Sequence, residues 1–387
     1  MKYSERLNAL PPYPFAEMEK AIAQKQGKGE EIISFGIGDP DAPPPKFVFD
    51  ALSKALKIDG MHNYSSSEGE RFFREAVAEW YKQRFNIDLN PDTQVCSLIG
   101  SKEGLANFTR AITNPGDKII CPNPSYPVYR QAASILNENV PIDVVLEPKL
   151  GFKPDLDAIG NKEFSCMFLN YPNNPTGGTA DTLFLKKAFE ICKDKKAVLC
   201  YDNAYSEITF DGFKAPSILQ VDKSMERSIE FHSCSKTFNM TGFRIGFAVG
   251  NEDLIRGLKR VKSQIDSGSP KFIQYAGAEA LKSYKNGKPP RETLETVKTY
   301  EKRMNLLVNG LRKLGYDAQI PFGTFYLWVK VNGSSKVFAS KLLEKGVVVT
   351  PGLAFGSGGE GYVRFSLTVD ERLVKRALEK IEQAVGK

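Results

Sequence analysis

Short apolar runs alternate with amphipathic stretches through the middle of the chain. The β-rich runs are QVCSLIG (94–100), KIICPN (118–123), VPIDVVL (140–146), CMFLNYP (166–172), AVLCYDN (197–203), SIEFHS (228–233) and GFRIGFAVG (242–250). Helix-like segments separate several of them, at 102–113, around 127–137 and at 179–192. Nearly continuous apolar strands separated by helices are typical of a mostly parallel sheet covered on both faces. We therefore predict an α/β fold with a seven-stranded main sheet.

The pattern changes after about residue 288. A long amphipathic stretch over 291–315 ends at Gly315, a residue suited to a helix C-terminus. The elements expected after it are strands at 325–331, 347–351 and 362–368, a helix near 335–345 and a final helix from Asp370. We predict a large α/β domain over 46–288. The proline-rich residues 1–45, read as an irregular arm, and residues 289–387 would form a smaller α+β domain.

Composition narrows the class of protein. The chain has 387 residues, of which 41% are hydrophobic and 26% charged, as in ordinary globular proteins. It has no apolar run of about 18 residues that could span a membrane. The N-terminal sequence MKYSERLNALPPYPF lacks the apolar core of a signal peptide. We expect a soluble, cytoplasmic protein that acts without a membrane.

Cysteine, histidine and charge exclude several kinds of site. The six cysteines are scattered singly, which argues against a disulfide framework and against a CxxC metal site. With two histidines, His62 and His232, a multi-histidine metal site is hard to build, and His232 reads as a packed strand residue. The net charge of +7 raises the possibility of nucleic acid. The basic clusters at 186–196 and 256–262 lie on helix-like faces, and no nucleic-acid-binding signature accompanies them, so we expect a small anionic partner.

Four polar motifs follow predicted strands, at the edge where open α/β sheets bind ligands. They are Gly100-Ser101-Lys102-Glu103-Gly104, Asn170-Tyr171-Pro172-Asn173-Asn174-Pro175-Thr176-Gly177, Tyr201-Asp202-Asn203-Ala204-Tyr205, and Ser233-Cys234-Ser235-Lys236-Thr237 with Arg244 shortly after it. Each has an ordinary structural reading as a helix cap, a turn or a surface lysine. Together they suit a phosphate at a helix N-terminus beside an arginine, with a lysine placed to form a Schiff base.

In this order the motifs resemble the class I/II aminotransferases of fold type I, which depend on pyridoxal 5'-phosphate. The resemblance covers nearly the whole chain and is strongest to LL-diaminopimelate aminotransferases. It is carried by LPPYPFAEME, SFGIGDPD, NYSSSEG, LIGSKEG, NPSYPVY, FLNYPNNPTGG, YDNAYSEI, FHSCSKTFNMTGFRIGFAVGN and VVVTPGLAFGSGGEGYVRFSLT. It implies transfer of an amino group from L-glutamate to tetrahydrodipicolinate, giving LL-2,6-diaminopimelate and 2-oxoglutarate in lysine or cell-wall synthesis.

The resemblance also implies roles for individual residues. Lys236 would carry the cofactor and act as general base, Asp202 would face the pyridine nitrogen, and Tyr205 would donate to the phenolic oxygen. The remaining cofactor contacts implied are Tyr126 on the ring face, Asn174 beside Tyr205, Ser101, Lys102, Ser233, Ser235 and Arg244 at the phosphate, and Tyr64 reaching the neighbouring subunit of a homodimer. The implied substrate contacts are Arg364 at the α-carboxylate, Gly38, Lys102, Asn174 and Tyr13.

One position departs from the family pattern, and three other functions remain open. Ser267 stands where relatives often carry asparagine, so it receives no role. An aspartate or alanine aminotransferase would share these motifs, as would a pyridoxal-phosphate-dependent β-lyase. A non-enzymatic regulator with a decayed cofactor domain is disfavoured, because Asp202, Tyr205, Lys236 and Arg244 are intact and no DNA-binding appendage is present. No metal ligand set accompanies the site.

Overall fold

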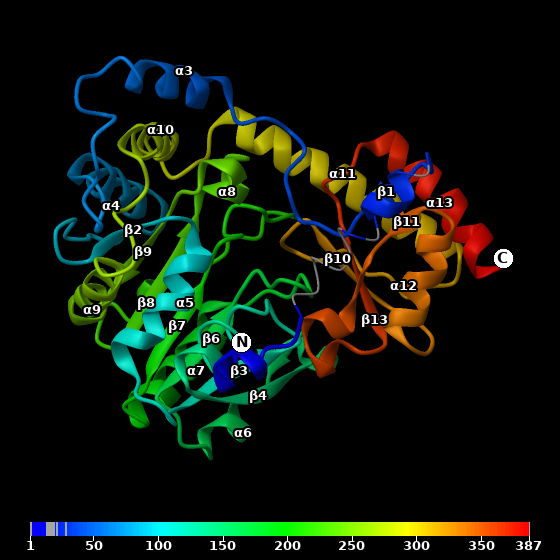
Figure 1. Ribbon diagram of the computed structural model, residues 1–387, viewed down its shortest axis with the longest axis horizontal. Helices are drawn as coiled ribbons and strands as arrows, with labels where there is room; N and C mark the ends of the chain where they lie inside the picture. Colours follow the sequence, from blue (N-terminus) through cyan, green and yellow to red (C-terminus); the bar gives the residue numbers. More distant parts are fainter. Residues whose placement is uncertain (1, 13–19, 21, 28, 387) are drawn as a thin grey trace.

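The described residues form three sheets, of which a large one and a smaller one organise the molecule and the third is a two-stranded pair (Figure 1). The computed structural model describes residues 2–12, 20, 22–27 and 29–386. Within these residues the larger sheet has eight strands, in the spatial order β2 Val95–Leu98, β9 Gly246–Gly250, β8 Ser228–Ser233, β7 Val198–Asp202, β6 Cys166–Asn170, β3 Lys118–Asn123, β4 Val140–Glu147 and β5 Lys153–Pro154. β9 runs antiparallel to β2 and β8, and β5 antiparallel to β4, whereas the other pairs are parallel.

The pattern of apolar runs located the strands of this sheet. Each of the seven predicted runs contains one of them, and the eighth, β5, is a two-residue edge strand that no pattern indicated. The expected α/β fold with a mostly parallel sheet is confirmed.

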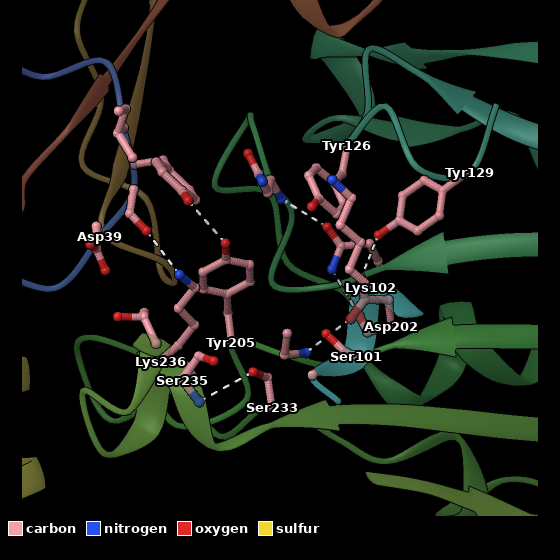
Figure 2. A pocket seen from close by; sticks show the side chains of 18 of the residues that line it. Asp39, Ser101, Lys102, Tyr126, Tyr129, Asp202, Tyr205, Ser233, Ser235 and Lys236 are labelled. Carbon is pink, nitrogen blue, oxygen red and sulfur yellow. Dashed lines mark hydrogen bonds between the residues drawn. The ribbon is translucent and has the colours of Figure 1, made fainter. Parts of the chain in front are cut away.

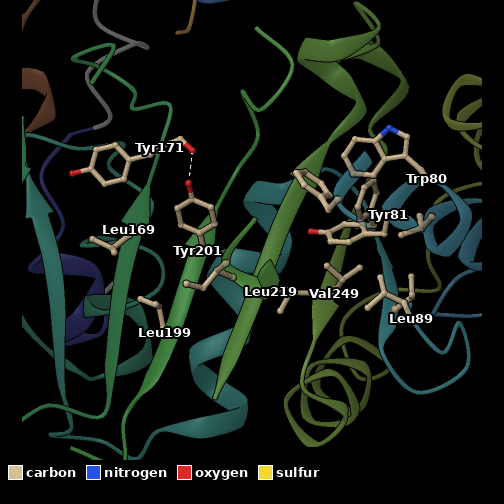
Figure 3. Close-up of a cluster of buried hydrophobic side chains, with 14 of the residues drawn as sticks. Trp80, Tyr81, Leu89, Leu169, Tyr171, Leu199, Tyr201, Leu219 and Val249 are labelled. Carbon is tan, nitrogen blue, oxygen red and sulfur yellow. Dashed lines mark hydrogen bonds between the residues drawn. The ribbon is translucent and has the colours of Figure 1, made fainter. Parts of the chain in front are cut away.

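Alternation along the strands explains why both faces of the sheet are covered. In β7, Leu199 and Tyr201 belong to one buried cluster, whereas Cys200 between them belongs to another. The first cluster is shown in Figure 3 and is closed by three helices, α4 Arg71–Phe85, α7 Thr182–Asp194 and α10 Lys271–Lys282. The second is closed by α5 Ser101–Ile112 and α9 Glu252–Lys262.

The smaller sheet lies among the last helices of the chain. It contains β10 Tyr326–Lys330, β13 Tyr362–Ser366 and β12 Thr350–Pro351 in this order, with antiparallel neighbours. The helices around it are α11 Arg291–Lys313, α12 Ser335–Glu344 and α13 Glu371–Val385. Gly315 follows α11 with a positive φ of 78°, and Asp370 caps α13 through the backbone N–H of Arg372, as expected of these positions.

The N-terminal segment is more ordered than an irregular arm. It contains the four-residue helix α1 Glu5–Asn8 and the strand β1 Ile33–Ser34, which pairs in parallel with β11 Val347–Val348. The shorter elements not yet named are α3 Lys46–Ala55, α6 Leu156–Gly160, α8 Cys234–Thr237, and the 3-10 turns η1 Ile135–Asn137, η2 Pro148–Leu150, η3 Ile218–Gln220, η4 Thr241–Phe243, η5 Gly352–Phe355 and η6 Ser357–Gly359.

Two predicted elements differ from the structure. The helix expected around 127–137 is a series of turns that ends in η1, because side chains occupy its carbonyl groups. Ser134 donates its hydroxyl to Tyr129 O, and Thr109 and Asn137 donate to Ala133 O. The strand expected over 242–250 begins at residue 246, because the backbone at Arg244 is left-handed, with φ 54°.

In the part of the chain that the structure describes, no helix is long and apolar enough to cross a membrane.

Candidate active site

The carboxyl ends of neighbouring parallel strands bring the sequence motifs together. β6 ends at Asn170, β7 at Asp202 and β8 at Ser233, so these residues share one edge of the sheet. A cavity of about 410 Å³ opens there, within the range of small-molecule sites. Its lining residues are Ile37, Gly38, Asp39, Gly100, Ser101, Lys102, Tyr126, Tyr129, Asn170, Asn174, Asp202, Ala204, Tyr205, Ser233, Ser235, Lys236, Thr241, Arg244, Tyr326 and Arg364.

Lys236 reaches the cavity from the short helix α8, directly after β8. Ser233 caps this helix by accepting from the backbone N–H of Ser235 at 3.2 Å. The Lys236 amine donates to the carbonyl oxygen of Gly38 at 2.8 Å. Burial lowers the pKa of Lys236 to about 8, against the opposing effect of the Asp39 charge and with a further lowering by Arg364 and Arg244. The amine is therefore readily deprotonated near neutral pH.

Asp202 lies across the cavity from Lys236 (Figure 2). It is 4% exposed, and its carboxylate accepts from the Tyr129 hydroxyl at 2.7 Å and the Ala204 N–H at 3.2 Å. Burial raises the pKa of Asp202 to about 6, while those two hydrogen bonds and the charge of His232 lower it. Both donors are uncharged groups, so the carboxylate is suited to meet a cation within the cavity.

Asn170 joins the end of the Asp202 strand to the asparagine-rich loop. Its side-chain amide donates to Asp202 O at 2.8 Å, and its side-chain oxygen accepts from Asn174 N at 2.9 Å. The same loop is held from within by Asn173, whose side-chain oxygen accepts from the hydroxyl of Thr176 at 2.7 Å. These bonds fix Asn174 with its side chain in the cavity.

Arg364 enters the cavity from β13 of the smaller sheet and is 2% exposed. Its guanidinium donates to Asn174 Oδ1 at 2.8 Å and to Gly36 O at 2.7 Å. The rings of Tyr326 and Phe355 lie 4.2 Å and 4.7 Å from the guanidinium carbon. Packing on both rings leaves the planar fork in one orientation, which suits two-point recognition of a carboxylate.

Hydroxyls, a helix N-terminus and an arginine gather at another part of the cavity. Gly100 precedes α5 with φ 79°, and a Cβ there would lie 2.4 Å from an Arg244 nitrogen. Ser101 opens α5, while Ser233 and Ser235 stand beside Lys236. Because a helix N-terminus and a guanidinium both favour negative charge, this region is suited to an anion.

Four tyrosines complete the lining. The Tyr205 hydroxyl lies 3.0 Å from that of Tyr326, and burial raises the pKa of Tyr205 well above its usual range. Tyr126 packs edge-on against Tyr129, with ring centroids 6.2 Å apart. Tyr205 therefore remains neutral, and both Tyr205 and Tyr126 present hydroxyl and ring surface to a ligand.

The charges of the cavity favour an anionic ligand. Its basic side chains, Lys102, Lys236, Arg244 and Arg364, outnumber its acidic ones, Asp39 and Asp202. A ligand carrying a phosphate and carboxylates matches this balance.

Most of the site residues expected from the sequence line this cavity. They are Gly38, Ser101, Lys102, Tyr126, Asn174, Asp202, Tyr205, Ser233, Ser235, Lys236, Arg244 and Arg364. One other, Tyr64, lies outside it and is 89% exposed on the segment before α4. Ser267, which received no role, is exposed in the loop before α10. The predicted contact of Tyr13 falls on a residue outside the described ranges.

The lining residues without a predicted role include Tyr129, Tyr326, Asp39 and Asn170, and the reasons differ. Tyr326 sits in an apolar run and Tyr129 in a segment read as a helix, and in both places an aromatic residue reads as core. Asp39 follows Gly38 in the segment SFGIGDPD, in which only Gly38 received a role. Asn170 was included in the asparagine-rich motif, and its position at a strand end was the available signal.

Neither a histidine nor a metal cluster contributes to the cavity. His232 is buried behind it, where its Nε2 lies 2.8 Å from both the Tyr81 hydroxyl and Glu230 Oε1, as expected of a packed strand residue. Over the described residues, no group of three or more His, Cys, Asp or Glu side chains could hold a metal ion. All six cysteines are buried and unpaired.

Known proteins share this sequence and this fold. The chain is 45% identical to the LL-diaminopimelate aminotransferase of Aquifex aeolicus (strain VF5), over 98% of each chain. It is 43% identical to the enzyme of the same name from Syntrophobacter fumaroxidans (strain DSM 10017 / MPOB), again over 98% of each chain.

Solved structures of other proteins have the same fold as this chain. Substrate-bound BacF from Bacillus subtilis superposes with a TM-score of 0.93 at 33% identity, over 99% of this chain and 98% of that one. An aspartate aminotransferase double mutant from Thermus thermophilus superposes with a TM-score of 0.92 at 27% identity, over 99% of this chain and 100% of that one.

The sequence profile of the aminotransferase class I and II family matches residues 30–381. This span includes the strand-end motifs, Lys236, Asp202 and Arg364. The chain belongs to the aminotransferase class I and II family.

Proposed function

We propose that this aminotransferase is an LL-diaminopimelate aminotransferase that depends on pyridoxal 5'-phosphate. It would pass the amino group of L-glutamate to tetrahydrodipicolinate, giving LL-2,6-diaminopimelate and 2-oxoglutarate for lysine or cell-wall synthesis. One observation carries the proposal: a single cavity joins a deprotonatable lysine, a buried carboxylate opposite it and a packed arginine. The names of relatives 43–45% identical support the choice of substrate.

The residues of the cavity fit pyridoxal phosphate. A Cβ at Gly100 would clash with Arg244, so the glycine lets the guanidinium lie directly against the start of α5, where one phosphate would meet both. Ser101, Ser233 and Ser235 would add hydroxyl donors. The Asp202 carboxylate, hydrogen-bonded by neutral groups alone, would meet a protonated ring nitrogen. Tyr205 and Asn174 would hold the phenolic oxygen, and Tyr126 would cover the ring.

When bound, this cofactor supplies an aldehyde carbon that exchanges amino groups and a ring that accepts carbanion charge. Lys236 would be the residue that carries it and then moves the proton at the substrate Cα. An amine with a pKa near 8 is partly uncharged at neutral pH, which suits a general base. Because Asp202 is buried, its negative charge acts on its partner with little screening by water.

Arg364 would orient the substrate through its α-carboxylate. Its Nη atoms are already directed by Asn174 Oδ1 and Gly36 O, and its plane is fixed between two rings. A two-point contact from a fixed guanidinium fixes the direction of the Cα–H bond relative to Lys236. Gly38 and Lys102, which border the same cavity, would contact the rest of the substrate.

We also propose that the working form is a homodimer. Tyr64 is 89% exposed and lies outside its own cavity, so a role at the phosphate requires a second subunit. Phe49 and Leu56, on and next to α3, are 43% and 62% exposed, an apolar surface that a second copy would cover.

A substrate panel tests the proposed function. Purified protein loaded with pyridoxal phosphate is given 2-oxoglutarate and one amino donor, and L-glutamate formation is measured. We expect LL-2,6-diaminopimelate to give a kcat/KM at least about 10²-fold above those of aspartate and alanine, because a site built for a second charged end rejects donors that lack it.

The panel also decides between this proposal and a second candidate. The 0.92 TM-score to an aspartate aminotransferase favours aspartate as the alternative donor. Preference for aspartate would replace the diaminopimelate assignment and keep the aminotransferase one. Release of pyruvate and ammonia from a cystathionine-like substrate, without glutamate formation, would indicate the β-lyase alternative. The Lys236→Ala variant, which loses the proton-transferring amine, is the inactive control.

A further inference from the structure

A segment without regular secondary structure crosses the active-site cavity. Residues 36–43, called the strap below, follow β1 and precede α3 without helix or strand geometry. Ile37, Gly38 and Asp39 of the strap line the cavity. Because no ladder of backbone hydrogen bonds holds such a segment, its position depends on the side chains that contact it.

Side chains of the active site bind the carbonyl groups of the strap. Arg364 Nη2 donates to Gly36 O at 2.7 Å, and Lys236 Nζ donates to Gly38 O at 2.8 Å. A Cβ at Gly38 would lie 2.0 Å from the Tyr326 hydroxyl, so the strap lies directly against that ring. The two charged groups needed for catalysis and substrate binding are thus both held by strap backbone.

The strap is fixed at its far end by an ion pair. Arg303, on α11 and 7% exposed, donates Nη1 and Nη2 to the two carboxylate oxygens of Asp41 at 2.8 Å and 2.7 Å. Its Nη1 also donates to Leu367 O at 3.0 Å, directly after the strand that carries Arg364. Within the described residues this is the strap's single ion pair. A paired, two-point contact on a mostly buried arginine is the strong form of such a bond.

We propose that Arg303 and Asp41 are positioning residues for the aminotransferase reaction. Their ion pair fixes the strap so that its Gly38 and Gly36 carbonyl groups hold the Lys236 amine and the Arg364 guanidinium in place. The inference rests on the proposed function, since it takes these two groups as the base and the carboxylate anchor. Neither Arg303 nor Asp41 borders the cavity itself, so both act through the strap.

The surroundings of Lys236 give the ion pair a measurable consequence. Burial, Arg364 and Arg244 lower the pKa of the amine, whereas Asp39 on the strap raises it. Displacing the strap lets water reach the amine and also removes the Asp39 charge and the Gly38 acceptor. Because burial is the largest of these effects, the Lys236 pKa should then rise above about 8.

The test uses the full-length protein with Arg303→Gln, Arg303→Lys and Asp41→Asn substitutions. Lys302→Gln is the matched control, because Lys302 is the neighbouring residue on α11 and pairs with Glu371 rather than with the strap. In the cofactor-free protein, trace acetylation at a series of pH values, read by mass spectrometry of the Lys236 peptide, gives the titration midpoint of the amine. Steady-state kinetics of the loaded enzyme and circular dichroism accompany it.

We expect Arg303→Gln and Asp41→Asn to raise the Lys236 midpoint by roughly one pH unit, because the displaced strap no longer buries the amine. Their KM for the amino donor should rise, and kcat/KM should fall on the order of 10²-fold, the cost of displacing a reacting group by about 1 Å. Arg303→Lys, which keeps the charge but loses the two-point geometry, should fall between wild type and Arg303→Gln. Lys302→Gln should match wild type.

The outcomes separate this proposal from the proposed function. A midpoint and kinetics equal to those of Lys302→Gln would overturn the proposal, even if thermal stability falls, because a merely structural ion pair affects folding alone. Asp41→Asn keeps the shape of a residue whose side chain is 34% exposed. If Arg303→Gln misfolds, the result for Asp41→Asn therefore decides the question. A wild-type protein that transaminates no donor would refute the proposed function, and the labelling experiment would still decide the role of the strap.

Discussion

Burial acts in opposite directions on the two charged side chains that lie across the cavity from each other. It lowers the pKa of Lys236 to about 8 and raises that of Asp202 to about 6, in both cases because the charged form loses hydration. Hydrogen bonds also affect the pKa of Asp202, because those from the Tyr129 hydroxyl and the Ala204 N–H favour its charged carboxylate form. The ionisation of Asp202 therefore depends on the hydroxyl of Tyr129.

Tyr129→Phe tests this dependence in the cofactor-free protein. The folded pKa of Asp202, about 6, lies above the ordinary value of 3.8, so its contribution to the free energy of unfolding falls as pH rises from about 4 through 6. Removing the hydroxyl raises the pKa further and extends this loss to higher pH. Urea unfolding should show Tyr129→Phe about 1–3 kcal/mol less stable than wild type at pH 8, with a smaller difference at pH 5.

Asp202→Asn supplies the control, since it removes the titrating group. Its free energy of unfolding should fall much less between pH 4 and pH 7 than that of wild type. A Tyr129→Phe deficit that is the same at pH 5 and pH 8 would mean that the hydroxyl contributes packing and not charge stabilisation.

Several polar residues at or shortly after apolar strands were identifiable from the sequence, whereas the aromatic residues Tyr129 and Tyr326 were not. Asp202 ends an apolar segment, and Lys236 and Asn174 follow one closely, where a buried polar group is costly without a partner. Tyr129 lies in a segment read as a helix and Tyr326 in an apolar run. Nothing in the pattern separates an aromatic residue that reaches a cavity from one that fills the core.

At the scale of elements, the segment 127–137 shows where periodicity misleads. Its apolar spacing favours a helix, yet Ala133 N donates to Val128 O and Ile135 N to Arg130 O, five residues back instead of four. Hydroxyl and amide side chains occupy the carbonyl groups that a helix would use. One of these donors, Thr109, comes from α5 and reaches the segment through tertiary structure, so sequence pattern alone could not reveal it.

Thr109→Val should weaken this segment. Thr109 is fully buried, and its hydroxyl donates to Ala133 O and accepts from Asn137 Nδ2. Loss of these bonds should lower the free energy of unfolding by about 1–3 kcal/mol in urea denaturation. Thr299→Val is the control, because the Thr299 hydroxyl bonds within the exposed face of α11. Equal effects of the two substitutions would contradict the account of residues 127–137.

At the scale of the whole molecule, Tyr64 separates a dimeric from a monomeric active site. If each Tyr64 serves the partner's cavity, two inactive variants restore each other: Lys236→Ala supplies Tyr64, and Tyr64→Ala supplies Lys236. After subunit exchange at equal amounts, half of the dimers are mixed and carry one complete site of two, so activity should return to about a quarter of wild type.

A mixture of the two variants without subunit exchange gives the baseline activity. Size-exclusion chromatography with light scattering gives the molecular mass of the protein in solution. A monomeric mass with full wild-type activity would contradict the homodimer, as would mixed dimers that stay inactive.

The sequence pattern predicted which helices and strands exist more reliably than it predicted their arrangement in space. The order β2-β9-β8-β7-β6-β3-β4-β5 does not follow the chain, and it depends on packing that periodicity does not encode. The passage of residues 36–43 across the cavity was equally hidden, because a proline- and glycine-containing segment reads as a loop of no particular direction. The predicted domain boundaries at residues 46 and 288 stay a prediction.

Reductive trapping tests the central claim most directly. The protein is loaded with pyridoxal phosphate and treated with borohydride, which makes the link between cofactor and lysine permanent, and its peptides are mapped by mass spectrometry. The account predicts one modified residue, Lys236, and no labelling at the cavity lysine Lys102. Cofactor attached at another lysine, or retained by the Lys236→Ala variant in reducible form, would contradict it.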